Sequence, residues 1–83
     1  MYKYEFGITG TTMYGHYNAF VVYKLNDGRF KVYKHTFTDS TIYDRSNEWP
    51  KKTYEKYSTQ LARKSEPQIF DSMPKRSFFR RAF

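Results

Sequence analysis

The sequence predicts an α+β fold: a three-stranded antiparallel β-meander with one packed helix and a basic, aromatic C-terminal arm. Three observations carry this prediction. Polar and apolar residues alternate at the N-terminus, an Asp-Gly turn separates two strand-like segments, and a helical pattern lies between two prolines. We therefore expect a single α+β domain over residues 1–74, followed by the arm over residues 75–83.

The first strand is predicted over residues 1–8, because apolar and polar side chains alternate there with a period of two. This period places every second side chain on one face, so we expect a half-buried strand. The residues expected on the apolar face are Tyr2, Tyr4, Phe6 and Ile8, and those on the other face are Lys3, Glu5 and Gly7. A turn or short loop is expected over residues 9–12.

The second and third strands are predicted over residues 14–25 and 30–38, joined by the Asp27-Gly28 turn. A two-residue turn would place Lys24 opposite Lys31, which is unfavourable because like charges repel across a strand pair. A three-residue turn with a bulge at Gly28 would separate the two lysines. The sequence leaves both turns open.

A helix is predicted over residues 50–65, since proline suits the first turn of a helix and Pro67 marks its end. Its apolar side chains gather on one side of a helical wheel and its basic side chains on the opposite side. The first set is Tyr54, Tyr57 and Leu61, and the second is Lys52, Lys56 and Arg63. Residues 39–47 are expected to form a connection, and the segment around Ile69, Phe70 and Met73 to lie over the core.

The chain has 83 residues, among them nine Tyr, eight Phe, one Trp and no Cys. A largely aromatic core follows, with several tyrosines left at the surface. The absence of cysteine excludes disulfides and makes the cytoplasm the default location. Neither a signal peptide nor a membrane-spanning stretch is visible, since the longest uncharged run, residues 6–23, is interrupted by glycines.

The net charge of +7 is concentrated in the C-terminal part of the chain. Residues 1–49 hold six Lys/Arg and five acidic residues, whereas residues 50–83 hold nine Lys/Arg and three acidic residues. This asymmetry favours a polyanionic partner for residues 50–83, with solubility as the alternative explanation.

The arm interleaves cations with phenylalanines, a pattern suited to phosphates and unpaired bases of RNA. We expect its cations to contact phosphates, the helix cations to form a second patch, and its aromatic rings to stack on bases or to anchor the arm. If the arm folds beside the helix, the two patches form one continuous basic surface. The residues assigned to phosphates are Lys75, Arg76, Arg80 and Arg81 in the arm and Lys52, Lys56 and Arg63 in the helix; the rings are Phe78 and Phe79.

The sequence contains little evidence for a catalytic, metal or cofactor site, so we expect a binding protein and not an enzyme. His16 and His35 on adjacent strands are the one candidate for acid–base cleavage of RNA. No metal-ligand spacing, phosphate loop or cofactor motif is present, and no named nucleic-acid module can be recognised. A small acidic and aromatic region around Asp44, Glu48 and Trp49, with Asp39 before it, is a further candidate contact for a partner's arginine.

In its basicity, its Tyr- and Lys-rich composition and its arm, KRSFFRRAF over residues 75–83, the chain resembles the small counter-defence proteins of T4-like bacteriophages. The resemblance extends to their toxin-inhibitory (antitoxin) type and implies an RNA-binding inhibitor, in the host cytoplasm, that docks on a ribonuclease toxin with RNA as a bridge. The alternative is a direct protein-binding inhibitor of the anti-CRISPR kind, anchored by Tyr and Trp. An unpaired strand edge also leaves self-association open.

Overall fold

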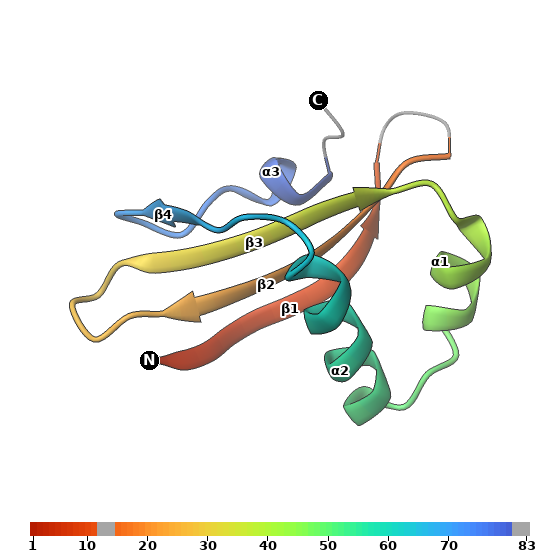
Figure 1. Ribbon diagram of the computed structural model, residues 1–83, viewed down its shortest axis with the longest axis horizontal. Coiled ribbons are helices and arrows are strands. Elements are labelled where there is room, and N and C mark those ends of the chain that lie inside the picture. Colours follow the sequence, from red (N-terminus) through yellow and green to blue (C-terminus); the bar gives the residue numbers. More distant parts are fainter. Residues whose placement is uncertain (12–14, 81–83) are drawn as a thin grey trace.

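An antiparallel sheet with strand order β1-β2-β3-β4 forms the centre of the computed structural model, which describes residues 1–11 and 15–80 (Figure 1). Tyr14, where the second strand was predicted to begin, and Arg81 lie outside the described residues. The elements in chain order are β1 (Tyr2–Gly10), β2 (Tyr17–Lys24), β3 (Phe30–Phe37), α1 (Ser40–Ser46), α2 (Lys51–Ala62), β4 (Gln68–Phe70) and α3 (Arg76–Arg80).

The α+β class and the antiparallel meander are confirmed, but the count of three strands and one helix is wrong: the described residues form four strands and three helices. The additional elements are too short for a periodic pattern. β4 has three residues, which pair with the start of β3, and α3 has five. α1 begins at an N-cap, where the Asp39 side chain accepts a hydrogen bond from the Thr41 N–H at 2.9 Å. The prediction of a connection over residues 39–47 did not take this N-cap into account.

The hairpin between β2 and β3 uses the three-residue turn of the two that the sequence left open. The Leu25 N–H donates to the Arg29 carbonyl at 2.8 Å, and Gly28 has a φ of 90°, in the left-handed region that glycine accepts without a steric penalty. Lys24 therefore lies opposite Phe30. The repulsion between Lys24 and Lys31 is avoided.

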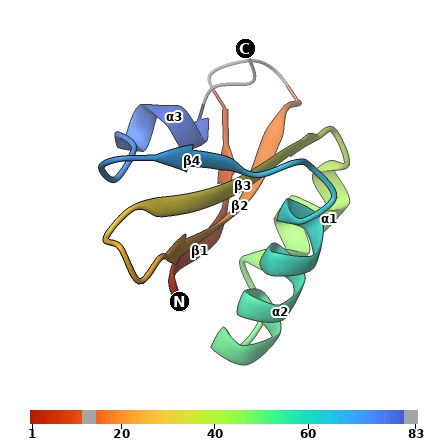
Figure 2. The same cartoon turned by 60° about the vertical axis from the view of Figure 1, so that its left-hand side comes forward.

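Both faces of the sheet are covered, one by α2 and the other by the segment that ends in α3 (Figure 2). The alternating side chains of β2 supply a separate apolar cluster to each face. We call one face the helix side: here Ala19 and Val21 of β2 pack with Ile8 and with Ala62 of α2. The partly buried rings around this cluster include those of Phe6, Tyr33, Tyr43, Trp49 and Tyr54.

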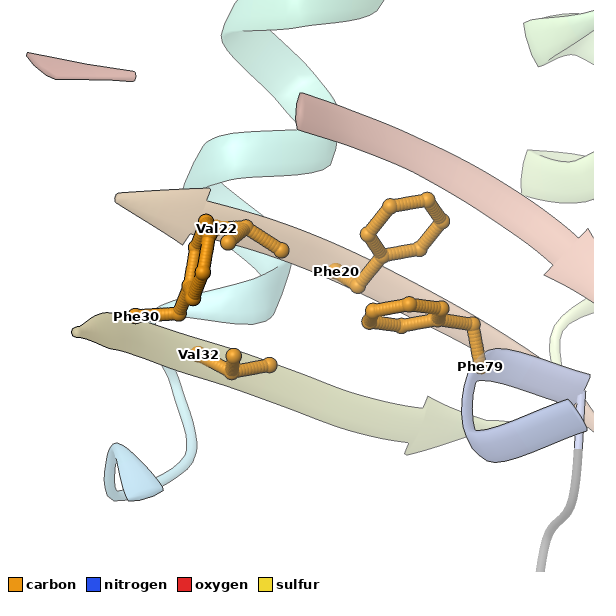
Figure 3. Close-up of a cluster of buried hydrophobic side chains, with 5 residues drawn as sticks. All are labelled: Phe20, Val22, Phe30, Val32 and Phe79. Carbon is orange, nitrogen blue, oxygen red and sulfur yellow. The ribbon is translucent and has the colours of Figure 1, made fainter. Parts of the chain in front are cut away.

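We call the other face the arm side, because the segment that ends in α3 lies over it. Phe20 and Val22 of β2 join Phe30 and Val32 of β3, and Phe79 of α3 packs on top of them (Figure 3). The core is thus strongly aromatic, as the composition indicates, and each face of the sheet has its own part of it.

A β-bulge in β1 changes which side chains share a face. Lys3 lies opposite Tyr23 of β2. The next residue back along β2, Val22, lies opposite Glu5, so Tyr4 is the extra residue of the bulge. The predicted single apolar face over residues 2–8 is therefore wrong, since the inserted residue reverses the alternation. Tyr2 and Tyr4 are on the arm side, and Phe6 and Ile8 are on the helix side.

Helix α2 packs through a face slightly rotated from the predicted one. Its fully buried residues are Ser58 and Ala62, while Tyr57 is 42% exposed and rests against Trp49. Tyr54 reaches the backbone of β1, which is an edge strand of the sheet. Its hydroxyl accepts a hydrogen bond from the Ile8 N–H at 2.7 Å and donates to the Ile8 carbonyl at 3.3 Å.

Candidate nucleic-acid interface

The outer side of α2 presents the three cations that the helical pattern assigned to it. Lys52, Lys56 and Arg63 are all exposed. Glu55 is the one acidic residue of the helix, and it forms an ion pair with Lys3 of β1 at 3.1 Å. Glu55 also lines a shallow hollow together with Lys52 and Lys56. Since the Lys3–Glu55 pair has no net charge, the three cations leave this side of the helix with a net positive charge.

The aromatic side chain of Tyr33 lies beside Arg63, at the end of this row of cations. The ring of Tyr33 on β3 has the guanidinium of Arg63 5.5 Å from its centroid and the ammonium of Lys31 5.6 Å from it. The Tyr23 ring meets it edge-on at 6.0 Å. We define the helix-side surface as Lys31, Tyr33, Lys52, Lys56 and Arg63. It combines cations for phosphates with an aromatic group, the chemistry that single-stranded nucleic acids require.

In the arm, the structure uses both predicted rings as anchors. Phe79 is 1% exposed and its centroid is 4.2 Å from that of Phe20. A ring this buried is out of reach of a base, so Phe79 holds the arm on the sheet instead of stacking on RNA. Phe78 is half-buried, and the ammonium of Lys34 lies 4.0 Å from its centroid.

The backbone of α3 is fixed by buried polar groups of the sheet. The Phe79 carbonyl accepts hydrogen bonds from the Asn18 side-chain amide at 2.9 Å and from the Thr9 hydroxyl. The side-chain oxygen of Asn18, Oδ1, in turn accepts a hydrogen bond from the Thr36 hydroxyl at 2.6 Å. Asn18 is fully buried, so leaving its side-chain amide without hydrogen-bond partners would be costly in free energy. These bonds therefore favour the observed position of α3.

The arm cations in the described part of the chain are exposed, but one of them already has a partner. Arg76 forms an ion pair with Glu5 of β1 at 3.1 Å. Lys75 is exposed, and Arg80 lines a shallow hollow with Thr9 and Tyr43, among others. Arg81, the fourth predicted phosphate contact of the arm, lies outside the described residues.

In the described part of the arm, α3 does not fold beside α2, so the condition for one continuous basic surface is not met. α2 covers the helix side of the sheet, where it packs on Ala19 and Val21, and α3 covers the arm side, where it packs on Phe20 and Val22 (Figure 2). Neighbouring residues of a strand point to opposite faces, so the sheet itself separates the patches. A single short RNA strand therefore meets one patch or the other.

The histidines are placed apart. His35 on β3 lies opposite Ala19, and His16 is three residues earlier than Ala19, about 10 Å along a strand. The Nδ1 of His35 lies 3.1 Å from the Ser65 hydroxyl. Burial first, and the nearby charge of Lys64 second, lower the pKa of His35 below its usual value. His16 and His35 therefore do not come together in one site.

A groove between α1 and α2 is the feature that the sequence did not reveal. It has a volume of about 530 Å³ and is lined by side chains from both helices and from Trp49 between them. The expected acidic and aromatic region is divided here: Trp49 turns to the groove, Asp39 caps α1, and no carboxylate is among the lining residues described. The lining residues are Ile42, Arg45, Trp49, Thr53, Tyr57, Gln60, Leu61 and Lys64.

Within residues 1–11 and 15–80, no helix is long and apolar enough to cross a membrane. The same residues contain no cluster of three His, Cys, Asp or Glu side chains that would hold a metal ion. Comparison with protein-family models, with characterised proteins and with solved structures finds no match to this chain.

Proposed function

We propose that this protein binds single-stranded RNA through the helix-side surface. The observation that carries the proposal is the row of exposed cations formed by Lys52 and Lys56 of α2 and by Arg63 at its C-cap, which ends at the Tyr33 ring. Arg63 is eleven positions after Lys52, so the row extends roughly 16 Å along the helix axis at 1.5 Å per residue. A few consecutive phosphates of an extended strand match this length.

The helix-side surface is preferred to the arm because the arm's rings are already engaged. Phe79 is buried in the core, and Arg76 is paired with Glu5. Lys75 and Arg80 form a second and separate basic surface on the arm side. We assign it a weaker, purely electrostatic role toward RNA.

The wider role that we propose is that of an RNA-binding inhibitor or adaptor in the cytoplasm. It rests on the resemblance of residues 75–83 and of the overall composition to phage counter-defence proteins of the toxin-inhibitory type. In that role, RNA held on the helix-side surface would bridge the protein to a ribonuclease toxin. RNA binding by the isolated protein is the property to test first, because the bridging role depends on it.

The test compares two variants with equal changes in charge. Lys52→Glu/Lys56→Glu reverses two cations of the helix-side surface, and Lys75→Glu/Arg80→Glu reverses two cations of the arm. Protein freed of nucleic acid is titrated with a fluorescently labelled single-stranded RNA, and the affinity is measured by anisotropy over a series of salt concentrations. Circular dichroism verifies that both variants are folded.

Each phosphate contact contributes about −0.7 to the slope of log affinity against log salt. We expect the helix variant to lose roughly 1.4 from the magnitude of this slope, and the arm variant to keep a slope close to that of the wild type. The reverse pattern would move the site to the arm. If the wild-type protein binds no RNA, the proposed function is wrong.

A further inference from the structure

The groove between α1 and α2 has the properties of a docking site for another molecule. Its apolar part is formed by Ile42, Trp49, Tyr57 and Leu61. The Trp49 and Tyr57 rings lie against each other, with centroids 4.9 Å apart, and Tyr57 is 42% exposed. A volume of about 530 Å³ is within the usual range of ligand pockets.

The charged side chains that line the groove are both basic. Arg45 of α1 and Lys64, just after α2, both line it, and the remaining polar lining residues, Thr53 and Gln60, are neutral. A ligand with an apolar centre and negative charges at its edges would therefore be complementary to the apolar lining and to the two basic side chains. Trp, Tyr and Arg are also the residues that most often dominate protein–protein binding energy.

We propose that this groove docks a segment of a partner protein in which an apolar side chain is flanked by acidic residues. The apolar side chain lies against Trp49 and Tyr57, and the carboxylates meet Arg45 and Lys64. A protein is favoured over RNA here because most of the lining is apolar and two cations suffice for a few carboxylates. The site is distinct from the helix-side surface, so it stands whether or not RNA binds there.

Trp49 is the single tryptophan of the chain, so the intrinsic tryptophan fluorescence reports on this groove alone. The experiment begins with a library of random dodecapeptides selected on the immobilised full-length protein. The most enriched peptide is synthesised, and its binding to the protein is followed through the Trp49 emission.

The test variant is Arg45→Glu/Lys64→Glu, and the matched control is Lys75→Glu/Arg76→Glu, which changes the net charge equally at exposed residues on the opposite face of the sheet. At physiological salt, charges further apart than about 8 Å are largely screened, so the control should leave peptide binding within about two-fold. The test variant should weaken it about ten-fold or more, because both ion pairs become repulsive. The variant Tyr57→Ala should weaken it as well.

The expected consensus is an aromatic or aliphatic residue between acidic residues, with a saturable change in Trp49 emission. The proposal is overturned if no peptide is enriched, if the enriched peptides are neutral or basic, or if Arg45→Glu/Lys64→Glu binds them normally. It is also overturned if only labelled RNA changes the Trp49 emission, since the groove would then hold a base. If the wild-type protein binds the peptide but binds no RNA, this inference stands while the proposed function fails, so the two results can be distinguished.

Discussion

The variant Phe79→Ala tests whether the C-terminal arm is part of the folded core. Phe79 is 1% exposed and packs on Phe20, Val22, Phe30 and Val32, all from β2 and β3 (Figure 3). If this packing is correct, the arm contributes to the stability of the whole sheet. If the arm is only an appended binding segment, the same substitution changes little.

The magnitude follows from the burial of the ring. Removing a fully buried phenylalanine ring costs about 3 to 5 kcal/mol, from lost transfer free energy and the cavity left behind. The total free energy of unfolding for a domain of this size is about 5 to 15 kcal/mol, so the loss is a large fraction of it. For 60 to 100 residues, each kcal/mol lowers the Tm by about 4 to 8 °C, which predicts a decrease of at least about 12 °C.

Urea unfolding followed by circular dichroism measures the free energy, and a thermal scan measures the Tm. Arg80→Ala is the control in the same helix, since the residue is exposed and its loss should change stability by less than about 0.5 kcal/mol. Phe78→Ala should be intermediate, because the ring is half-buried. A loss of less than about 1 kcal/mol in Phe79→Ala would refute the packing of α3 on the sheet.

Three further predictions concern other parts of the fold. Gly7→Ala should destabilise the protein by about 1 to 3 kcal/mol in urea unfolding, because the added Cβ would lie 3.0 Å from the Phe20 ring; wild-type stability would contradict this close approach. Asn18→Ala should cost about 1 to 3 kcal/mol by the same measurement, since it removes a donor to the Phe79 carbonyl, and a neutral effect would exclude that bond. The pKa of His35 is lowered in the folded state, so the protein should lose stability as the pH falls below about 6.5, toward the lower folded-state pKa. His35→Gln should flatten this part of the stability–pH profile, and an unchanged slope would assign the effect to another group.

The elements with a long periodic pattern were predictable from the sequence. The hairpin from β2 to β3 and the helix α2 have eight or more residues each, so their alternation and their helical period are readable. The elements α1, β4 and α3 have seven residues or fewer, too few for a readable period. α1 has a local signal, the Asp39 N-cap, which was missed, whereas β4 and α3 depend on contacts with distant residues. The bulge at Tyr4 belongs to the same group, because it follows from pairing with β2.

The candidate site was predictable in its composition but not in its geometry. The exposed cations of α2 followed from the helical wheel. The separation of the arm from α2 did not, because it depends on which face of β2 the ring of Phe79 occupies. The groove was also missed. Arg45 and Trp49 are four positions apart, but Lys64 is fifteen positions after Trp49, and only the placement of α1 beside α2 brings it to them.

The hydrogen bonds between Tyr54 and Ile8 have a consequence for the behaviour of the protein at high concentration. β1 is a nine-residue edge strand, and such an edge is a template on which another chain adds its own strand. At Ile8 the side-chain hydroxyl already occupies both backbone groups that an incoming strand would need. One phenolic oxygen thereby blocks strand addition near the C-terminal end of this edge, and the bulge at Tyr4 disturbs the edge again nearer the N-terminus. Tyr54, which fixes α2 to the sheet, thus protects this aromatic-rich chain against edge-to-edge aggregation of its sheet.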